Sequence, residues 1–190
     1  MIEIRFPDQS TRSYAHGITP FEIAKSISEA LARNVLSVKF NGQIVEASTP
    51  LKNDGNIDLF TWNDKEGKTA FWHSSAHVLA QALLALYPAC KLTIGPAIEN
   101  GFYYDADFGE YSITEKDLVI IEKKMLEFAR QKFDFKMRSI SKSEALAHYQ
   151  KENNPFKIEL IENLEDGTIT FCDHADFTDL CRGGHIAQTG

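Results

Sequence analysis

The chain has 190 residues, 43% of them hydrophobic and 25% charged, which is enough apolar material for a folded core and argues against global disorder. No run approaches the roughly 18 apolar residues of a membrane span, and the opening residues alternate like a strand, unlike a signal peptide. We therefore expect a cytoplasmic protein with no membrane partner. The net charge of −7 opposes extensive binding to a nucleic-acid backbone, but leaves open a local pocket for a short single-stranded end.

Residues 1–62 are predicted to form a compact unit. Thr19 followed by Pro20 is typical of a helix start, because threonine caps the first turn and proline suits its first residue. Asn41-Gly42 favours a tight hairpin turn. The element order is ββαββ with one late strand, which predicts a ubiquitin-like β-grasp fold. The strands are expected at 2–6, 11–14, 35–40, 43–45 and 56–60, and the helix is expected to carry Phe21, Ala24, Ile27 and Leu31 on one face.

Residues 63–190 are predicted to form a larger unit of layered helices and strands, so that the fold class is α+β. The polar stretch 61–70 is interpreted as a linker, followed by a helix over about 70–87. Because the chain stops without a clear terminal element, we expect an excised fragment whose last strands lie beyond Gly190. The other expected elements are a strand at 92–98, an aromatic strand pair at 102–108, a helix capped by Thr114 with Leu118, Ile121, Met125 and Phe128 as its apolar stripe, a strand at 133–140, a helix from Ser143 to about Tyr149, and strands at 158–161 and 168–172.

Two histidines on the first long helix are the earliest candidates for chemistry. His73 and His77 are four residues apart, which places both imidazoles on one helix face, near enough to share a water molecule or a metal ion. Apolar residues surround them along the helix, so we expect the pair to face a cleft. The alternative is two buried histidines that hydrogen-bond to backbone carbonyls.

Cys181 and His185 lie in a second motif, DLCRGGH, where two glycines allow the backbone to approach a ligand closely. Together with His73 and His77 they supply four ligands of the types that zinc prefers. The same set suits a metal-free hydrolytic pocket, in which histidine polarises water and cysteine shapes the site. A lone cysteine is more often a small buried apolar residue, and in a reducing compartment we expect all three cysteines to stay unpaired.

Three segments carry a resemblance to a known family: HSSAHVLAQAL, IGPAIENGFYYDAD and DLCRGGH, in this order. They resemble the signature segments of the editing domain of threonyl-tRNA synthetases, and the first sixty residues resemble the TGS domain that precedes it. The resemblance covers essentially the whole chain. Alanyl-type editing domains share the HxxxH and CxxxH pairs, whereas the GPAIENGFYYD segment and the TGS-like unit favour the threonyl family.

The resemblance implies roles for seven residues. His73, His77, Lys157 and His185 match catalytic positions, whereas Cys181, Asp179 and Tyr104 match residues that line the aminoacyl pocket. From the sequence alone Lys157 looks like a solvated lysine and Tyr104 like a core aromatic. Gly184 departs from the family, which more often has proline there, and we expect this change to loosen the turn that orients His185.

The implied reaction is hydrolysis of serine wrongly esterified to the 3′ end of tRNA(Thr). A synthetic pocket cannot exclude a substrate that is smaller by one methyl group, so a second, smaller pocket is needed. The resemblance further implies that ligation of threonine, with its ATP, magnesium and zinc, resides in a missing catalytic domain. We expect no cofactor in this fragment, zinc at the four-residue site being the alternative, and a monomeric fragment of a homodimeric enzyme. The rival interpretations are an alanyl-type trans-editing zinc hydrolase and a non-catalytic module that holds the tRNA acceptor arm.

Overall fold

A computed structural model describes residues 1–190 and divides into two compact units, each described here by itself. The first comprises Met1–Phe71 with Gly183–Ala187, and the second comprises Trp72–Arg182 with Gln188–Gly190. All three cysteines, Cys90, Cys172 and Cys181, are free and buried. No helix has the length and apolar character needed to cross a lipid bilayer.

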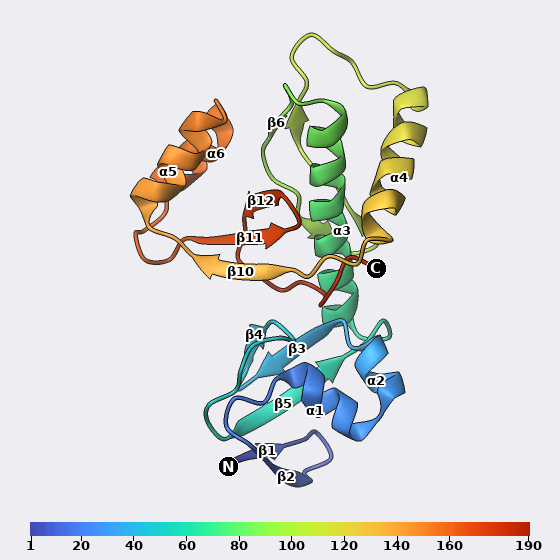
Figure 1. Ribbon diagram of the computed structural model, residues 1–190, viewed down its shortest axis with the longest axis vertical. Helices are drawn as coiled ribbons and strands as arrows, with labels where there is room; N and C mark the ends of the chain where they lie inside the picture. Colours follow the sequence, from blue (N-terminus) through green and yellow to red (C-terminus); the bar gives the residue numbers. More distant parts are fainter. The chain divides into compact units, whose positions relative to one another are not determined.

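The first unit contains a five-stranded sheet with the strand order β2-β1-β5-β3-β4 (Figure 1). Strand β1 pairs in parallel with β5 and every other neighbouring pair is antiparallel, which confirms the predicted β-grasp arrangement. Alternate residues of β1 enter the core, because successive side chains of a strand point to opposite faces. The strands are β1 (Ile2–Arg5), β2 (Thr11–Tyr14), β3 (Ser37–Phe40), β4 (Gln43–Val45) and β5 (Gly55–Phe60).

Two short helices replace the single helix expected in this unit. Thr19 forms a capping box at the start of α1 (Pro20–Ile27), and Ser28 ends that helix and caps α2 (Glu29–Asn34). The predicted apolar face is partly wrong, since Phe21 and Ile27 are exposed whereas Ile23 and Ala24 are fully buried. The predicted hairpin turn is confirmed, since Asn41 and Gly42 have φ values of 49° and 82°.

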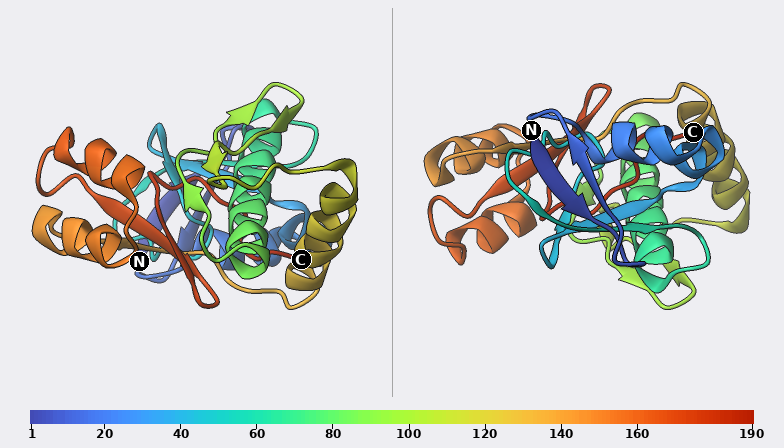
Figure 2. Two further views of the ribbon diagram at one scale, coloured as in Figure 1. Left: turned by 90° about the horizontal axis from the view of Figure 1, so that it is seen from above. Right: turned by 90° about the horizontal axis from the view of Figure 1, so that it is seen from below.

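Helix α3 (Lys65–Leu86) begins in the first unit, where its first turns occupy residues 65–70 and a linker was expected. The second unit is built around the rest of this helix, from Trp72 onward. Helix α4 (Glu115–Ala129) lies beside α3 (Figures 1 and 2). Ile121 of α4 and Leu83 of α3 belong to one apolar cluster. Asp117 accepts a hydrogen bond from the Thr114 backbone N–H, which closes the capping box of α4. Leu118 was expected in the apolar stripe of α4, but it is exposed.

A three-stranded antiparallel sheet forms the other part of this unit, with the order β10-β11-β12. Two helices cover one of its faces (Figure 2), and Tyr149, Ile161 and Phe171 form their shared core. Two expectations here are wrong: Ser141 caps the first of these helices instead of Ser143, and residues 158–161 are helical instead of extended. The elements are β10 (Lys136–Ser139), α5 (Lys142–Lys151), α6 (Pro155–Glu162), β11 (Thr170–His174) and β12 (Phe177–Leu180).

Four two-residue strands connect α3 to α4. The expected long strand at 92–98 is divided, and the two halves of the expected aromatic pair do not pair with each other. Instead β6 pairs with β9 and β7 pairs with β8. Gly95, between β6 and β7, therefore lies next to Tyr104, between β8 and β9. These strands are β6 (Lys91–Leu92), β7 (Ala97–Ile98), β8 (Gly101–Phe102) and β9 (Ala106–Asp107). The mixture of helices with separate small sheets confirms the α+β class.

Candidate functional site

Helix α3 presents His73 and His77 to a cavity of about 660 Å³ in the second unit. Their Nε2 atoms lie 3.3 Å apart, as the four-residue spacing on one helix face allows. His77 is buried, with 3% of its surface exposed, and His73 is half-buried. Gln81, one turn further along α3, donates a hydrogen bond to Asp176 in the turn before β12. The helix that carries both imidazoles is therefore tied to the hairpin that carries the next two site residues.

Strand β12 supplies Asp179, and Cys181 follows directly after the strand. The two residues share one face because they are two apart in extended backbone. The Cys181 Sγ atom lies 3.4 Å from Nε2 of His73. The Cys181 backbone is fixed on both sides by Thr170, since its N–H donates to the Thr170 carbonyl at 3.1 Å and its carbonyl accepts from the Thr170 hydroxyl.

Lys157 enters the cavity from the first turn of α6. Asn154 caps this helix by accepting the Lys157 N–H at 3.2 Å, and Pro155 occupies its first turn. The lysine is 2% exposed, although lysine is almost never fully buried unless it is paired. Its Nζ lies 2.5 Å from Oδ1 of Asp179, so the two side chains form a buried ion pair.

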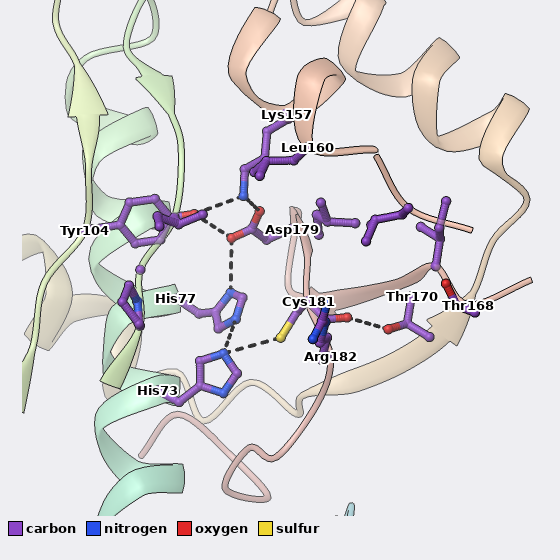
Figure 3. A pocket seen from close by; sticks show the side chains of 16 residues that line it. His73, His77, Tyr104, Lys157, Leu160, Thr168, Thr170, Asp179, Cys181 and Arg182 are labelled. Atoms are coloured by element: carbon purple, nitrogen blue, oxygen red, sulfur yellow. Dashed lines mark hydrogen bonds and ion pairs between the residues drawn. The ribbon is translucent and has the colours of Figure 1, made fainter. Parts of the chain in front are cut away.

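Asp179 is the centre of this polar network (Figure 3). Its Oδ2 accepts the Tyr104 hydroxyl at 2.6 Å and lies 3.6 Å from Nδ1 of His77, while the Tyr149 hydroxyl donates to Oδ1 at 3.3 Å. Tyr149 in turn accepts the backbone N–H of Leu180 at 2.8 Å. Several partners therefore compensate the desolvation of the carboxylate.

Both tyrosines are held in the protonated form. Burial is the main cause, and the adjoining Asp179 carboxylate adds to it, so that the pKa of Tyr104 is well above its usual range. Burial and the same carboxylate also raise the pKa of Tyr149. Each hydroxyl can therefore act as a hydrogen-bond donor throughout the neutral pH range.

The rest of the cavity wall is largely apolar, whereas the histidines, Cys181, Lys157 and Asp179 gather on one side (Figure 3). A cavity of this volume lies within the range that small-molecule ligands occupy. Gly95 also lines it, where a Cβ atom would lie only 2.2 Å from Cδ2 of Tyr104. Glycine at this position therefore lets the Tyr104 ring pack against the loop backbone. The remaining lining residues are Ile94, Pro96, Leu160, Leu164, Thr168, Ile169, Thr170, Leu180 and Arg182.

Six of the seven predicted residues thus line one cavity: His73, His77, Tyr104, Lys157, Asp179 and Cys181. The seventh, His185, lies in the segment 183–187, which groups with the first unit. Its buried ring has Nδ1 3.2 Å from Oε1 of Glu46. Tyr149, Gly95 and Thr170 were not among the predicted residues. Their roles depend on contacts that form only in the folded unit, with Asp179, Tyr104 and Cys181, respectively.

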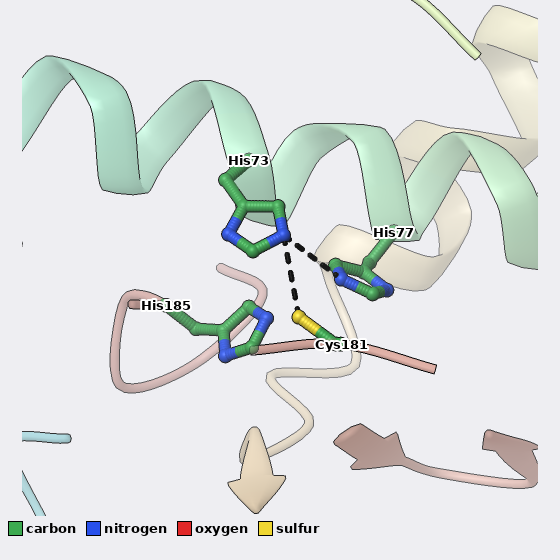
Figure 4. A group of neighbouring side chains, drawn as sticks. All are labelled: His73, His77, Cys181 and His185. Atoms are coloured by element: carbon green, nitrogen blue, oxygen red, sulfur yellow. Dashed lines mark hydrogen bonds between the residues drawn. The ribbon is translucent and has the colours of Figure 1, made fainter. Parts of the chain in front are cut away.

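His73, His77 and Cys181 also have the donor types of a zinc site. One ligand atom from each lies within 4.8 Å of the others. The His73–His77 and His73–Cys181 separations, 3.3 and 3.4 Å, agree with the roughly 3.3–3.7 Å between neighbouring ligands of a tetrahedral zinc ion. Figure 4 draws these side chains with His185, the fourth residue of the predicted set. The residues therefore fit zinc, and they equally form a hydrogen-bonded cluster of two imidazoles and a cysteine sulfur.

The fold and the site define a class in which a TGS domain precedes a unit with a polar, histidine-lined cavity. The TGS domain family model matches residues 2–61. Over its full length, the chain is 63% identical to a threonine–tRNA ligase of Flavobacterium johnsoniae, 55% to that of Cytophaga hutchinsonii and 49% to that of Bacteroides fragilis. It spans 29%, 30% and 29% of these relatives, respectively. The predicted resemblance to the N-terminal region of threonyl-tRNA synthetases is confirmed.

Proposed function

We propose that the second unit hydrolyses the ester bond of serine wrongly attached to tRNA(Thr). One observation carries this proposal: imidazole, thiol, ammonium, carboxylate and phenol groups converge on one cavity in a chain similar to threonine–tRNA ligases. A cavity of about 660 Å³ exceeds the size of serine alone and has room for part of the terminal nucleoside. The tRNA partner itself follows from the names of the relatives.

The need for this reaction follows from the size of the two amino acids. Serine lacks one methyl group of threonine, and a pocket built for threonine discriminates against it by only about 10–200-fold. A second pocket can exclude the larger amino acid by steric clash. We propose that Tyr104, Asp179 and Cys181 form the amino-acid end of this second pocket. The Asp179 carboxylate is the natural partner for the substrate's α-ammonium group.

The chemical step joins a water oxygen to the ester carbonyl carbon and breaks the bond from that carbon to the ribose oxygen. The ribose oxygen takes up a proton, and serine leaves with a free carboxyl group. We assign His73 to accept the proton of the attacking water, because it is less buried than His77 and His185 and contacts both His77 and Cys181. His77 and His185 are assigned to orient the ester and the ribose.

Lys157 is assigned an electrostatic role. Its ammonium group donates to Asp179 at 2.5 Å and lies 3.4 Å from the Tyr104 hydroxyl, so it is fixed within the polar side of the cavity. A positive charge in a buried site stabilises the oxyanion that develops on the ester carbonyl. It also holds the Asp179 carboxylate in place for the amino group of the substrate.

Zinc is the alternative source of this stabilisation. If it binds, His73, His77 and Cys181 would hold it, with His185 as the fourth residue of the set, and the ion would lower the pKa of a bound water to about 7. We propose the metal-free form, because Lys157 already provides a positive charge in the cavity. In the longer protein, we propose that a separate catalytic domain ligates threonine to tRNA(Thr) with ATP.

The test is the initial rate of serine release from Ser-tRNA(Thr) by the chain and by the His73→Ala/His77→Ala double variant. We expect a loss of at least about 100-fold, since general acid–base residues contribute about 10²–10⁴. His16→Ala, at an exposed histidine of the first unit, is the matched control and should leave the rate unchanged. An intact threonine–tRNA ligase from Flavobacterium johnsoniae serves as the positive control. An unchanged rate in the double variant would refute the proposal.

Two further substrates separate the rival functions. Preferred hydrolysis of Ser-tRNA(Ala) or Gly-tRNA(Ala) would favour an alanyl-type editing hydrolase. Tight binding of tRNA(Thr) with no serine release, while the positive control is active, would favour a module that only holds the acceptor arm.

A further inference from the structure

We propose that Glu46, in the first unit, is a positioning residue that fixes the tautomer and the orientation of His185. This inference deepens the function proposed above and rests on it. None of the sequence motifs singles out Glu46, which is separated from His185 by 139 residues. The observation that carries it is a three-way contact in which one carboxylate oxygen meets two donors from the glycine-rich segment.

The oxygen is Oε1 of Glu46. It accepts the backbone N–H of Gly184 at 2.9 Å and lies 3.2 Å from Nδ1 of His185. The His185 side chain is completely buried, and only 13% of the Glu46 side chain is exposed. A shielded contact of this kind is stronger than the same contact in water, because nearby solvent does not screen it.

The Glu46 side chain projects from a fixed backbone. Glu46 directly follows β4, and its carbonyl accepts the N–H of Thr49 at 2.9 Å. The next residue, Ala47, is buried, and its carbonyl accepts the N–H of Phe21 in α1. The carboxylate therefore starts from a position set by the β-grasp fold rather than from a mobile loop.

A carboxylate can only accept hydrogen bonds, so Nδ1 of His185 must carry a proton to bond with it. In the neutral ring this leaves Nε2 as the unprotonated nitrogen. An unprotonated Nε2 can accept a hydrogen bond from a ribose hydroxyl or a water molecule, which is the action assigned to His185. The carboxylate thus selects one of two tautomers and also limits rotation of the ring.

Gly184 allows this arrangement through its backbone. Its φ of +87° lies in the left-handed region, which glycine adopts readily, and its N–H is the second donor to Glu46. A Cβ atom at this position would make only an ordinary contact with Ile44, at 3.7 Å. The left-handed conformation, rather than a lack of space, therefore favours glycine here, and the need for an N–H donor excludes only proline. The expectation that Gly184 loosens the turn that orients His185 stays a prediction.

The experiment compares the 190-residue chain with Glu46→Ala, with the isosteric Glu46→Gln and with the control Glu29→Ala, which removes an exposed glutamate of the same unit. The His185 tautomer is measured by long-range ¹H–¹⁵N correlation at about pH 8.5, where an ordinary imidazole is neutral. Serine release from Ser-tRNA(Thr) is measured in parallel.

We expect the Nδ1–H tautomer in the wild type, in Glu46→Gln and in the control, and a mixture of tautomers in Glu46→Ala. The hydrolysis rate should fall about 10–100-fold in Glu46→Ala, as for other residues that orient a site histidine, and glutamine should restore most of it. A wild-type Nε2–H tautomer would overturn the proposal even if Glu46→Ala did not fold. Equal losses of rate in the alanine and glutamine variants would also overturn it. Failure of the proposed function would instead appear as no serine release in the wild type, with the tautomer shift still present.

Discussion

Lys157 and Asp179 form a buried ion pair, with Nζ 2.5 Å from Oδ1 and neither side chain more than 4% exposed. One partner comes from the start of α6 and the other from β12. The pair therefore links two elements of the second unit at the cavity wall. Removing two charges from water is costly, and their mutual attraction must offset this cost.

The first prediction concerns the stability of this pair. Asp179→Ala leaves the Lys157 charge buried without its carboxylate, so we expect the free energy of unfolding to fall by about 3–5 kcal/mol. The double variant Lys157→Met/Asp179→Leu removes both charges and should be less destabilised than Asp179→Ala. Urea unfolding followed by circular dichroism measures both values. A double variant that is the least stable of the set would contradict this reasoning.

The second prediction concerns Gly95 and Tyr104. A Cβ atom at position 95 would meet the Tyr104 ring at 2.2 Å, so Gly95→Ala should push the ring away from Asp179. We expect a loss of about 1–3 kcal/mol of stability and a slower release of serine. In a Tyr104→Ala background the same glycine change should cost little, because the clashing ring is absent. If the cost were the same in both backgrounds, the clash would not be its cause.

The third prediction concerns Gly184. Proline cannot adopt a φ of +87° and has no N–H to donate to Glu46, so Gly184→Pro should destabilise the chain by more than about 1 kcal/mol. Gly184→Ala retains the N–H and should lose less. Thermal unfolding of both variants tests this order. A proline variant as stable as the wild type would mean that the segment can adopt another turn.

The fourth prediction is a loss of stability at alkaline pH. Burial, with a smaller contribution from Asp107, raises the pKa of Cys90 to about 11, and burial and Asp117 raise the pKa of Tyr87 to about 12. The native state retains these protons at pH values where the unfolded chain has lost them. The stabilisation is complete below the unfolded pKa values and is lost as the pH rises through the folded ones. Between about pH 9 and 12, the free energy of unfolding should therefore decrease.

Urea unfolding across that pH range measures this effect. The variants Cys90→Ala and Tyr87→Phe lack the titrating groups and should each flatten the slope. A free energy of unfolding that rises over this range would contradict the assignment.

The fifth prediction concerns metal. Because Lys157 supplies a positive charge in the cavity, we expect serine release to continue at an unchanged rate after exhaustive chelation. Metal analysis of protein purified without chelator, together with the rate before and after chelation, tests this. A rate that falls with the lost zinc and returns when zinc is added would instead support a zinc site at His73, His77 and Cys181.

Local sequence signals predicted much of the first unit. The Thr19-Pro20 start and the Asn41-Gly42 turn act through nearest neighbours, and both are confirmed. The break between α1 and α2 at Ser28 was not predicted. The predicted apolar face, drawn for one continuous helix, therefore included the exposed residues Phe21 and Ile27. The short apolar run at 158–161 predicts a strand, but such a run does not distinguish a strand from a buried helix, and these residues are helical. Asn154 as a helix cap, followed by Pro155 as the first helical residue, is the sequence signal that indicates a helix here.

The histidine pair on α3 was predicted from its spacing alone, since four residues make one helix face. The contacts of Lys157 could not be predicted from the neighbouring sequence, because its partners Asp179 and Tyr104 are 22 and 53 residues away. Only the family resemblance identified this lysine. Tyr149 was missed for the same reason, since its role depends on a contact with β12 formed in the folded unit.

The central claim is that this cavity accepts serine and excludes threonine. The most direct measurement is the ratio of initial rates for release of serine from Ser-tRNA(Thr) and of threonine from Thr-tRNA(Thr), with the same chain and the same tRNA. We expect serine to be released faster by at least about 10-fold, the lower limit of what one methyl group contributes. Equal rates, or faster release of threonine, would contradict the account.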